Sequence, residues 1–444
     1  MSKRAAGSYH IETWGCQMNV HDSEKLAGSL EREGYIKAEA AEQADLILLN
    51  TCSIREKAAE KVFSELGRLK RLKRTRPRMV IGVCGCVAQQ EGERIFERAP
   101  HVDFVLGPRA TGSLGELLAR HRAGRAIDLE QRSDSIDFPH RQIRRRESNP
   151  AKAYVTVSEG CNHRCTYCVV PRTRGPEICR DMNSILEEVA MLAGQGRVEV
   201  EFLGQTVNAY RDGDGRTLAD LLIEAANIDG IARIRFTTSH PAHMSEQLMD
   251  AMAAAQSKVC PYIHLPLQSG SSAVLKSMRR GYDREGYLKK IEGLRRRLPG
   301  ILFGTDIIVG FPSESEEDFE QTLGLMAEAQ FDTVYSFAYS ERPGTRAIAL
   351  GDPVPLEAKL ERLRRLQESQ KKFQERRNQA WVGKSLEVLV EGRSKRDSSK
   401  WSGRTPENRV VNFTGGSAPG RLETIRIASA TAYSLRGELV LSCA

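Results

Sequence analysis

The chain alternates short apolar runs with long charged stretches, and this alternation constrains its fold more than any other feature. Asp45–Leu49 and Met79–Val83 are apolar runs that end in polar or glycine-rich turns, and Ser53–Arg74 between them is charged and compatible with a helix. Buried parallel strands have this continuous apolar character, and the helices between them cover the sheet. Residues 8–125 are therefore predicted to form a small α/β layer domain.

The alternation resumes after Ser133–Pro150, a polar stretch rich in Arg and Ser, and we place the linker at residues 126–146. Residues 147–379 then predict roughly six βα units, and so a partial (β/α) barrel with its function at the carboxyl ends of the strands. The expected strands are Ala153–Val157, Val198–Leu203, Ile234–Thr238, Tyr262–Leu267, Phe303–Val309 and Thr333–Tyr339. The expected helices include Asn183–Ala193 and Glu316–Ala329.

The last part of the chain changes character. Leu356–Ala380 is a charged helical stretch with an apolar stripe at Leu356, Leu360, Leu363 and Leu366. Residues 380–444 hold three strand-like segments with glycine-rich spacers, Ser385–Val390, Val410–Phe413 and Glu423–Ser429. They predict a small antiparallel β-barrel. Its cations suit an RNA backbone, although a stabilising appendage with solvated charges is the alternative. They are Lys384, Arg393, Lys395, Arg396, Lys400 and Arg404.

Size and charge narrow the class of protein. A chain of 444 residues predicts two or three domains, and its net charge of +8 is compatible with nucleic acid. The basic runs Arg68–Arg78 and Arg141–Arg146 are either solvated helix faces or a phosphate-binding surface. Met1–Trp14 lacks a secretory signal and no apolar stretch is long enough to cross a bilayer, so we expect a cytoplasmic protein that does not contact membranes. In a reducing compartment, ten cysteines indicate metal ligation or catalysis.

Cys161, Cys165 and Cys168 form a C-x3-C-x2-C triplet just after the expected strand Ala153–Val157. Three thiolates in one tight loop can hold three irons of a cubane cluster and leave the fourth iron open to another ligand. A zinc knuckle is the alternative, but structural zinc takes four ligands, and His163 lies awkwardly between two of the cysteines.

The early cysteines form a second group. Cys16, Cys52 and Cys86 each follow a strand-like run, and the carboxyl ends of parallel strands meet at one edge of a sheet. They could hold a second cluster with an open iron, or they could be scattered buried thiols. Spacing does not decide between Cys84 and Cys86 as the third ligand. Cys179, Cys260 and Cys443 have no partners at ligand spacing, and we expect free thiols there.

The triplet, with Tyr167 before its third cysteine, resembles the loop of the radical S-adenosylmethionine superfamily. More widely, ETWGCQMNVHDSE, GCVAQQEG, VSEGCNHRCTYCVVPRTRG, HLPLQSGS and GRTPENRVVNF resemble the methylthiotransferase family within it, over nearly the whole chain. The string NTCSIREKAAEKVFSELG is typical of the branch that acts on isopentenyladenosine in tRNA, called MiaB. Arg172 stands where the family commonly has an aromatic residue, and Cys179 where it commonly has Ser.

The resemblance implies a fold, cofactors and an activity. It implies an N-terminal α/β domain, a radical S-adenosylmethionine core and a C-terminal TRAM barrel. It also implies two [4Fe–4S] clusters, one held by Cys16, Cys52 and Cys86 and one by Cys161, Cys165 and Cys168. S-adenosylmethionine would be both methyl donor and source of the 5′-deoxyadenosyl radical, and the N-terminal cluster would supply or carry sulfur. Matched positions for cofactor contacts are Tyr167, Gln205, Asn208, Ser239, Gln268, Ser269 and Asp306.

The implied reaction is methylthiolation at C2 of N6-isopentenyladenosine at position 37 of tRNA, next to the anticodon. The hydrogen at C2 is not acidic, so acid–base catalysis alone cannot remove it and a carbon radical can. An electron donor such as flavodoxin or ferredoxin and a monomeric state are further expectations. The alternatives are a threonylcarbamoyladenosine tRNA or a ribosomal-protein aspartate as substrate, or a non-catalytic iron–sulfur RNA-binding redox sensor. The open iron argues against the sensor, since a sensor does not need one.

Overall fold

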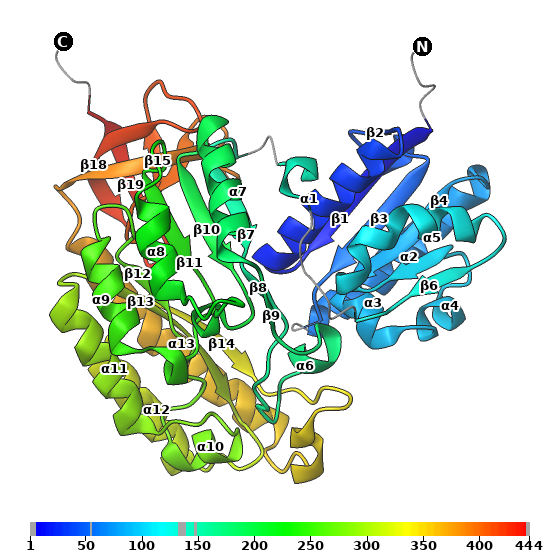
Figure 1. Ribbon diagram of the computed structural model, residues 1–444. Helices are drawn as coiled ribbons and strands as arrows, with labels where there is room; N and C mark the ends of the chain where they lie inside the picture. The colour runs from blue at the N-terminus through cyan, green and yellow to red at the C-terminus, as the bar shows by residue number, and fades with distance from the viewer. Residues whose placement is uncertain (1–5, 54–55, 132–138, 146–148, 441–444) are drawn as a thin grey trace. The chain divides into compact units, whose positions relative to one another are not determined.

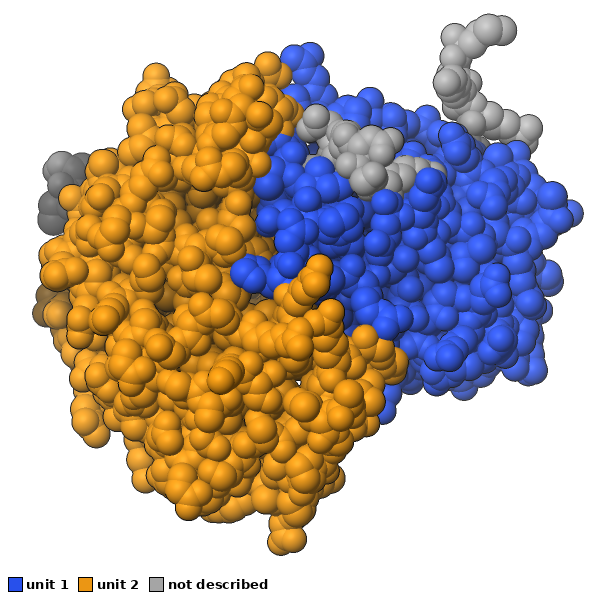
Figure 2. Space-filling view, turned by 60° about the horizontal axis from the view of Figure 1, so that its bottom comes forward, with its two compact units in different colours: residues 1–146, 158–163, 169–180 blue, residues 147–157, 164–168, 181–444 orange. Residues whose placement is uncertain are grey.

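The computed structural model describes residues 6–53, 56–131, 139–145 and 149–440 (Figure 1). The chain divides into two compact units, coloured blue and orange in Figure 2. Unit 1 comprises residues 1–146, 158–163 and 169–180, and unit 2 comprises residues 147–157, 164–168 and 181–444. No helix among the described residues is both long enough and apolar enough to cross a membrane.

Unit 1 is built on a six-stranded sheet of order β2-β1-β3-β4-β5-β6, and every neighbouring pair in it is parallel. Its strands are β1 Gly7–Trp14, β2 Tyr35–Lys37, β3 Leu46–Thr51, β4 Val80–Gly85, β5 Phe104–Leu106 and β6 Ala126–Asp128. Its main helices are α1 Gln17–Arg32, α2 Glu56–Thr75, α3 Cys86–Glu91, α4 Arg94–Arg98 and α5 Leu114–His121. The predicted α/β layer domain is confirmed.

Helices cover both faces of this sheet because β3 is apolar on both sides. Ile47 and Leu49 pack into one buried cluster, which takes Val62, Leu66 and Leu69 from α2. Leu46 and Leu48 pack into the other cluster, which takes Leu26 and Leu30 from α1 and Leu114 and Leu117 from α5. A strand buried on both faces needs a continuous apolar run, which is what the sequence shows there.

Unit 2 contains six parallel strands in chain order, in two three-stranded sheets that a parallel bridge between Ile234 and Val259 links. They are β7 Lys152–Thr156, β10 Glu199–Leu203, β11 Arg233–Phe236, β12 Tyr262–His264, β13 Leu302–Val309 and β14 Thr333–Ala338. The helices are α7 Met182–Gly194, α8 Leu218–Ala226, α9 Glu246–Ala254, α10 Ser272–Ser277, α11 Arg284–Arg297, α12 Glu316–Ala329 and α13 Leu356–Gln379. This is the expected partial barrel.

The C-terminal part of unit 2 is a closed five-stranded barrel of order β15-β16-β17-β19-β18. Its strands are β15 Ser385–Arg393, β16 Trp401–Arg404, β17 Val410–Thr414, β18 Leu422–Ala430 and β19 Leu435–Leu439. Four neighbouring pairs are antiparallel and one pair, β17 and β19, is parallel, so the expected small antiparallel barrel is present with one parallel pair. An odd number of strands cannot alternate in direction around a closed ring, and one parallel pair must remain.

The packing face of α13 also differs from the predicted apolar stripe. Leu356 and Leu360 are 67% and 52% exposed, and only Leu366 of that stripe is fully buried. The buried face is instead polar, and it carries Lys359, Arg362, Gln370, Gln374 and Asn378. These side chains reach backbone carbonyls and acids of neighbouring elements. Examples are Gln370 Nε2 to Phe331 O at 3.0 Å and Gln374 Nε2 to Asp332 O at 2.8 Å.

Buried arginines on β11 hold the five-stranded C-terminal barrel against the amino-terminal ends of the six parallel strands. Arg233 Nη1 donates to Arg404 O at 2.8 Å, and Arg235 donates to Pro406 O and Thr405 O, both at 2.8 Å. Arg235 is in turn paired with Glu199, 3.0 Å away, at the start of β10. The carboxyl ends of the same strands are therefore left for a ligand site.

We expect Arg235→Met to destabilise the full-length chain by about 3–5 kcal/mol, because it removes a partner from a buried carboxylate. Burial alone would raise the pKa of Glu199, but Arg235 and Lys152 lower it from the ordinary 4.5 to about 2. A depressed carboxyl pKa stabilises the fold above 4.5, and this contribution is lost as the pH falls toward 2.

Chemical denaturation at pH 7 and at acidic pH measures both effects. Arg235→Met should also flatten the acid dependence of the free energy of unfolding. The matched control is Arg426→Met on the exposed face of β18, which should change that energy by less than about 0.5 kcal/mol. Equal stability of the two variants would contradict the role assigned to Arg235.

Candidate functional site

Three of the early cysteines directly follow one row of the sheet in unit 1. Trp14, Thr51 and Gly85 are register partners across β1, β3 and β4 at the carboxyl ends of these strands. Cys16, Cys52 and Cys86 lie one or two residues beyond that row. The chain also turns back here, since β2 and β3 lie on opposite sides of β1. Open parallel sheets bind ligands at such a switch point.

Glycine permits the close approach of these loops. A Cβ atom on Gly15 would lie 2.6 Å from Cys52 Cβ and 2.5 Å from Asn19 Oδ1, and the φ of Gly15 is +150°. Gly85, with φ +86°, would bring a Cβ to within 2.3 Å of Asn50 Oδ1. Only glycine fits at either place without a shift of the backbone.

The electrostatics of this edge favour the thiolate form of Cys16. A hydrogen bond from Cys52 lowers the pKa of Cys16 to about 6, and Cys16 also caps the amino end of the 16-residue helix α1, where anions are stabilised. Burial raises the pKa of Cys86, and the neighbouring Arg174 guanidinium acts in the opposite direction. Thiolates are the form that ligates iron.

Buried hydroxyl groups flank Cys52. Thr51 Oγ1 and Ser53 Oγ are both buried and have no hydrogen-bond partner among the described residues. Buried polar atoms are usually satisfied, and sulfur atoms held at this edge could accept from both hydroxyls. The donor set therefore fits an iron–sulfur cluster.

Cys84 lies in a different environment from Cys86. Its side chain packs in the apolar cluster with Tyr9, Leu48 and Phe104, and burial raises the pKa of its thiol strongly. Strand β4 ends at Gly85 and Cys86 begins α3, so the strand alternation that would place both thiols on one side stops between them. Of the two, only Cys86 has Cys16 and Arg174 as electrostatic neighbours.

The second cysteine group lies in the loop after β7. Cys161 Sγ accepts from the backbone N–H of His163 at 3.4 Å, and Cys165 Sγ accepts from Arg280 Nη1 at 3.3 Å. Donors aimed at sulfur suit thiolate ligands. None of the nine cysteines that the structure describes is in a disulfide, and Cys443 lies outside the described residues.

A single-ion site of cysteines is not found in the described part of the chain. The one group of three ligand atoms within 4.8 Å of one another consists of Asp181, Asp212 and Asp214, and Arg216 is paired with all three. Cubane ligands bind different iron corners and lie farther apart than the ligands of one zinc ion.

Arg280 and Arg174 are site residues that the sequence analysis missed. Arg280 is buried, and its guanidinium also donates to Tyr282 Oη at 2.9 Å and to Pro266 O at 3.2 Å. Tyr167, in the same cysteine loop, packs against the apolar cluster that contains Met278 and Tyr339. A single arginine in a basic protein gives no signal in the sequence, and the position of Arg280 two residues before the half-buried Tyr282 becomes informative only in the fold.

The predicted cofactor residues follow the carboxyl ends of successive strands. Gln205 and Asn208 follow β10, Ser239 follows β11, Gln268 and Ser269 follow β12, and Asp306 lies within β13. The backbone is strained at two of these ends, where Thr238 has φ +67° and Gln268 has φ +76°. Positive φ is rare for such residues and clusters at ligand sites.

The side chains of these residues differ in how they are engaged. The side-chain amide of Asn208 donates a hydrogen bond to the carbonyl of His240 and accepts one from the N–H of His240, which indicates a positioning role. Ser269 Oγ is 3.4 Å from Thr322 Oγ1 on α12. Ser239 Oγ, in contrast, is buried with no hydrogen-bond partner in the described chain. It is the strand-end hydroxyl best placed to accept a ligand contact.

The inner face of the partial barrel carries two exposed aromatic rings. Ser336 accepts from Gln367 of α13 at 3.3 Å, so α13 covers the side of β14 that Ser336 occupies. Tyr335 and Phe337 alternate to the other side and are 47% and 40% exposed. Tyr335 is the register partner of Asp306, which pairs with His264 at 3.2 Å.

Many of the predicted phosphate-binding cations are engaged within the protein. Arg68 is paired with Glu65, Glu42 and Glu12, and Arg76 is paired with Asp45. In the barrel, Lys400 pairs with Asp397, and Arg393 stacks 3.9 Å from the centre of the Trp401 ring. Lys395 and Arg396 are exposed. Surface ion pairs are weak and can exchange for phosphate contacts.

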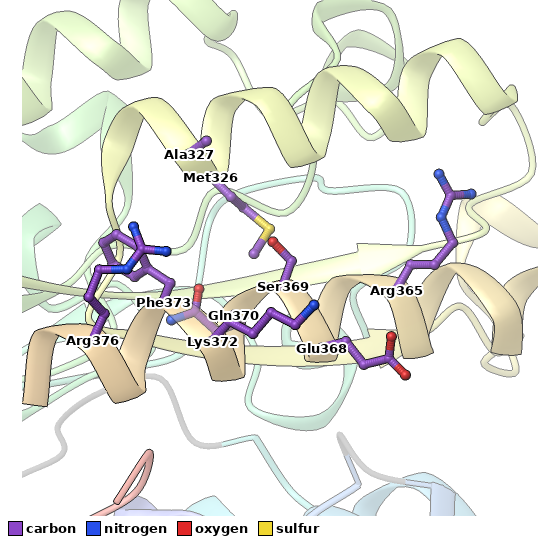
Figure 3. A pocket seen from close by; sticks show the side chains of 9 residues that line it. All are labelled: Met326, Ala327, Arg365, Glu368, Ser369, Gln370, Lys372, Phe373 and Arg376. Carbon is purple, nitrogen blue, oxygen red and sulfur yellow. The ribbon is translucent and has the colours of Figure 1, made fainter. Parts of the chain in front are cut away.

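A cavity of about 390 Å³ lies between α12 and α13 (Figure 3). It is lined by Met326, Ala327, Arg365, Glu368, Ser369, Gln370, Lys372, Phe373 and Arg376. None of the predicted cysteine or cofactor residues belongs to this lining. Gln370 bonds the carbonyl of Phe331, so the cavity lies on the helical side of the strands and not on their inner face.

Comparison with known proteins identifies the family. Three family models match in succession: the uncharacterized protein family UPF0004 over residues 8–107, the radical SAM superfamily over residues 155–326 and the TRAM domain over residues 379–440. The chain is 49% identical over 440 residues to the tRNA-2-methylthio-N(6)-dimethylallyladenosine synthase of Alkalilimnicola ehrlichii, and the match covers 98% of each chain. The chain belongs to this synthase family.

A second family member, from Syntrophotalea carbinolica, is 44% identical over 442 residues, 98% of this chain and 100% of that protein. Among solved structures, the radical S-adenosylmethionine methyltransferase TsrM from Kitasatospora setae matches with a TM-score of 0.56 at 16% identity. That match covers 77% of this chain and 74% of the other. At this identity, the match is evidence about the fold of the chain alone. A radical SAM core implies one [4Fe–4S] cluster and S-adenosylmethionine, and the Cys165 and Arg280 contact fits that cluster.

We expect Cys86→Ser to lose about half the iron of the reconstituted chain and all methylthiolation, because Cys86 is the thiol beside Cys16. Cys84→Ser should keep about eight irons per chain, two cubanes' worth, and stay active. Iron and sulfide analysis with an activity assay measures both variants. The reverse pattern would move the ligand to Cys84.

Proposed function

We propose that the chain inserts a methylthio group at C2 of N6-isopentenyladenosine at position 37 of tRNA, with two iron–sulfur clusters and S-adenosylmethionine. One observation carries the proposal: two groups of cysteines lie beyond the carboxyl ends of parallel strands, and a buried arginine lies beside a cysteine of each group. Family membership supplies the substrate, since the relatives bear that synthase name.

Cys161, Cys165 and Cys168 would hold the radical cluster, and the open iron would take S-adenosylmethionine. When bound there, such a cluster would supply the electron for reductive cleavage of S-adenosylmethionine, and the carbon radical that results would be reactive enough to remove the C2 hydrogen. Arg280 orients Cys165, and Ser239 offers an unpartnered hydroxyl to the cofactor. Tyr167 packs the apolar side of the cysteine loop against the cluster that contains Met278 and Tyr339.

Cys16, Cys52 and Cys86 would hold the second cluster, as the supply of sulfur. The low pKa of Cys16 and the buried hydroxyls of Thr51 and Ser53 support this assignment. S-adenosylmethionine would also serve as the methyl donor. The proposal also includes an external reductant such as flavodoxin or ferredoxin, and a monomeric chain. Its domains would be residues 8–125, 147–379 and 380–444, with a linker at 126–146.

The substrate base would lie on the inner face of the partial barrel. Tyr335 and Phe337 present exposed rings there, beside the His264–Asp306 pair. Aromatic side chains stack on nucleobases, and an isopentenyl group gains free energy from apolar contact. The C-terminal barrel would hold the RNA backbone through its exposed cations, Lys395 and Arg396 among them. The exposed aromatic face favours an adenine over an aspartate side chain as substrate.

The two clusters can be separated by mutation. Cys165→Ala should abolish both reductive cleavage of S-adenosylmethionine and product, because it removes one corner of the radical cluster. Replacing Cys16, Cys52 and Cys86 together should leave 5′-deoxyadenosine measurable and eliminate methylthiolated tRNA. Chromatography of the nucleosides reports both products. Several turnovers of methylthiolation by the triple variant would refute the sulfur-supply role.

We expect Tyr335→Ala and Phe337→Ala to weaken binding of an isopentenylated anticodon stem-loop, by about 1–3 kcal/mol for a lost stacking contact. The ratio of its affinity to that of the unmodified stem-loop should fall, since an apolar contact to the isopentenyl group is lost. Tyr433→Ala, at a 72% exposed tyrosine of the C-terminal barrel, is the control and should leave the ratio unchanged. Unchanged ratios in all three variants would place the base elsewhere.

A further inference from the structure

Arg174 is a buried cation next to the early cysteines. It is 2% exposed, and its Nη2 donates to Asp22 Oδ2 at 2.5 Å. The guanidinium is a side-chain hydrogen-bonding neighbour of the Cys86 thiol, and it lies within electrostatic reach of Cys16. Its Nη1 is nevertheless buried and has no partner with full hydrogen-bond geometry among the described residues.

Three elements of unit 1 meet at this guanidinium. Asp22 lies on α1, which begins directly after Cys16, and Cys86 is the first residue of α3. Arg174 directly follows the short helix α6, Val170–Thr173, which packs against α3. Asp22, Cys86 and Arg174 therefore come from three separate parts of the chain and lie together inside one unit.

The charged side chains around Arg174 are largely paired, and one N–H donor group of Arg174 is still available to an anion. Asp22 offsets its positive charge, and the nearby Lys25 and Glu159 pair with each other at 3.2 Å. A cluster held beside Arg174 would bring negative charge into a low-dielectric region, where that charge needs compensation. The unpartnered Nη1 is the buried donor available for that purpose.

We infer that Arg174 is a positioning residue for the second cluster, one that donates through Nη1 to sulfur at the Cys86 corner and compensates its negative charge. The inference rests on the proposed second cluster. Hydrogen bonds to cluster sulfur and nearby positive charge both favour the reduced, more negative state. Arg174 therefore raises the reduction potential of this cluster, and Asp22, which holds the guanidinium from the other side, lowers it.

A redox titration of the second cluster alone tests the inference. The full-length chain with Cys161, Cys165 and Cys168 changed to Ala is reconstituted with iron and sulfide, and the reduced cluster is followed by electron paramagnetic resonance. With Arg174→Met, the ratio of reduced to oxidised cluster at a fixed potential should fall at least tenfold, which is about 59 mV for a one-electron couple. Asp22→Asn should shift the ratio in the opposite direction.

Arg172→Met is the matched control, since it removes an exposed cation two residues away on the same segment. It should leave the ratio unchanged. A purely structural role for Arg174 would not produce shifts of opposite sign in the Arg174 and Asp22 variants. Equal potentials in all variants with iron retained would overturn the inference and leave the proposed function intact.

Two further outcomes are decisive. The first concerns the chain in which Cys161, Cys165 and Cys168 are changed to Ala. If this variant binds no iron, the second cluster is absent, and both the proposed sulfur supply and the inference fail. If Arg174→Met alone loses its iron, Arg174→Lys decides, because it keeps the charge and should retain the cluster at an intermediate potential. Loss of iron in both variants, with an unchanged potential for Asp22→Asn, would overturn the charge role.

Discussion

Parallel strands bring their carboxyl ends to one edge of a sheet, and the sites of this chain depend on that constraint. In unit 1 it aligns Trp14, Thr51 and Gly85 in one row, so that residues far apart in sequence deliver Cys16, Cys52 and Cys86 to one place. In unit 2 the same constraint gathers the strand-end polar residues beyond β10, β11 and β12. The C-terminal barrel occupies the amino ends, where buried Arg233 and Arg235 hold it.

Buried charge is the second recurring feature. Thiolates are costly in a low-dielectric interior unless donors and cations compensate them, and a buried arginine lies beside each cysteine group. Arg280 reaches Cys165 from the helical part of unit 2, and Arg174 lies beside Cys86 in unit 1. Both arginines have additional polar partners, Tyr282 and Asp22 respectively, which fix the guanidinium groups before any cluster is present.

Sequence patterns predicted the strands and the cysteine groups because continuous apolar runs and ligand spacing are local signals. Helix α12 begins and ends at the residues expected, since Ser315 caps it and Glu316 opens the charged run. The buried face of α13 was missed because Gln370 and Gln374 satisfy backbone carbonyls that belong to distant elements. The parallel β17–β19 pair follows from closing a ring of five strands. The roles of Arg174 and Arg280 depend on tertiary neighbours, which no sequence spacing reveals.

The central claim is that one chain generates a carbon radical and places sulfur and a methyl group at C2 of an isopentenylated adenosine. The most direct measurement incubates the reconstituted chain with isopentenylated tRNA, a reductant and S-adenosylmethionine carrying a deuterated methyl group, followed by mass spectrometry of the nucleosides. The account predicts 2-methylthio-N6-isopentenyladenosine with the deuterated methyl on sulfur, and 5′-deoxyadenosine formed alongside it. Formation of 5′-deoxyadenosine with the tRNA unchanged would contradict the account.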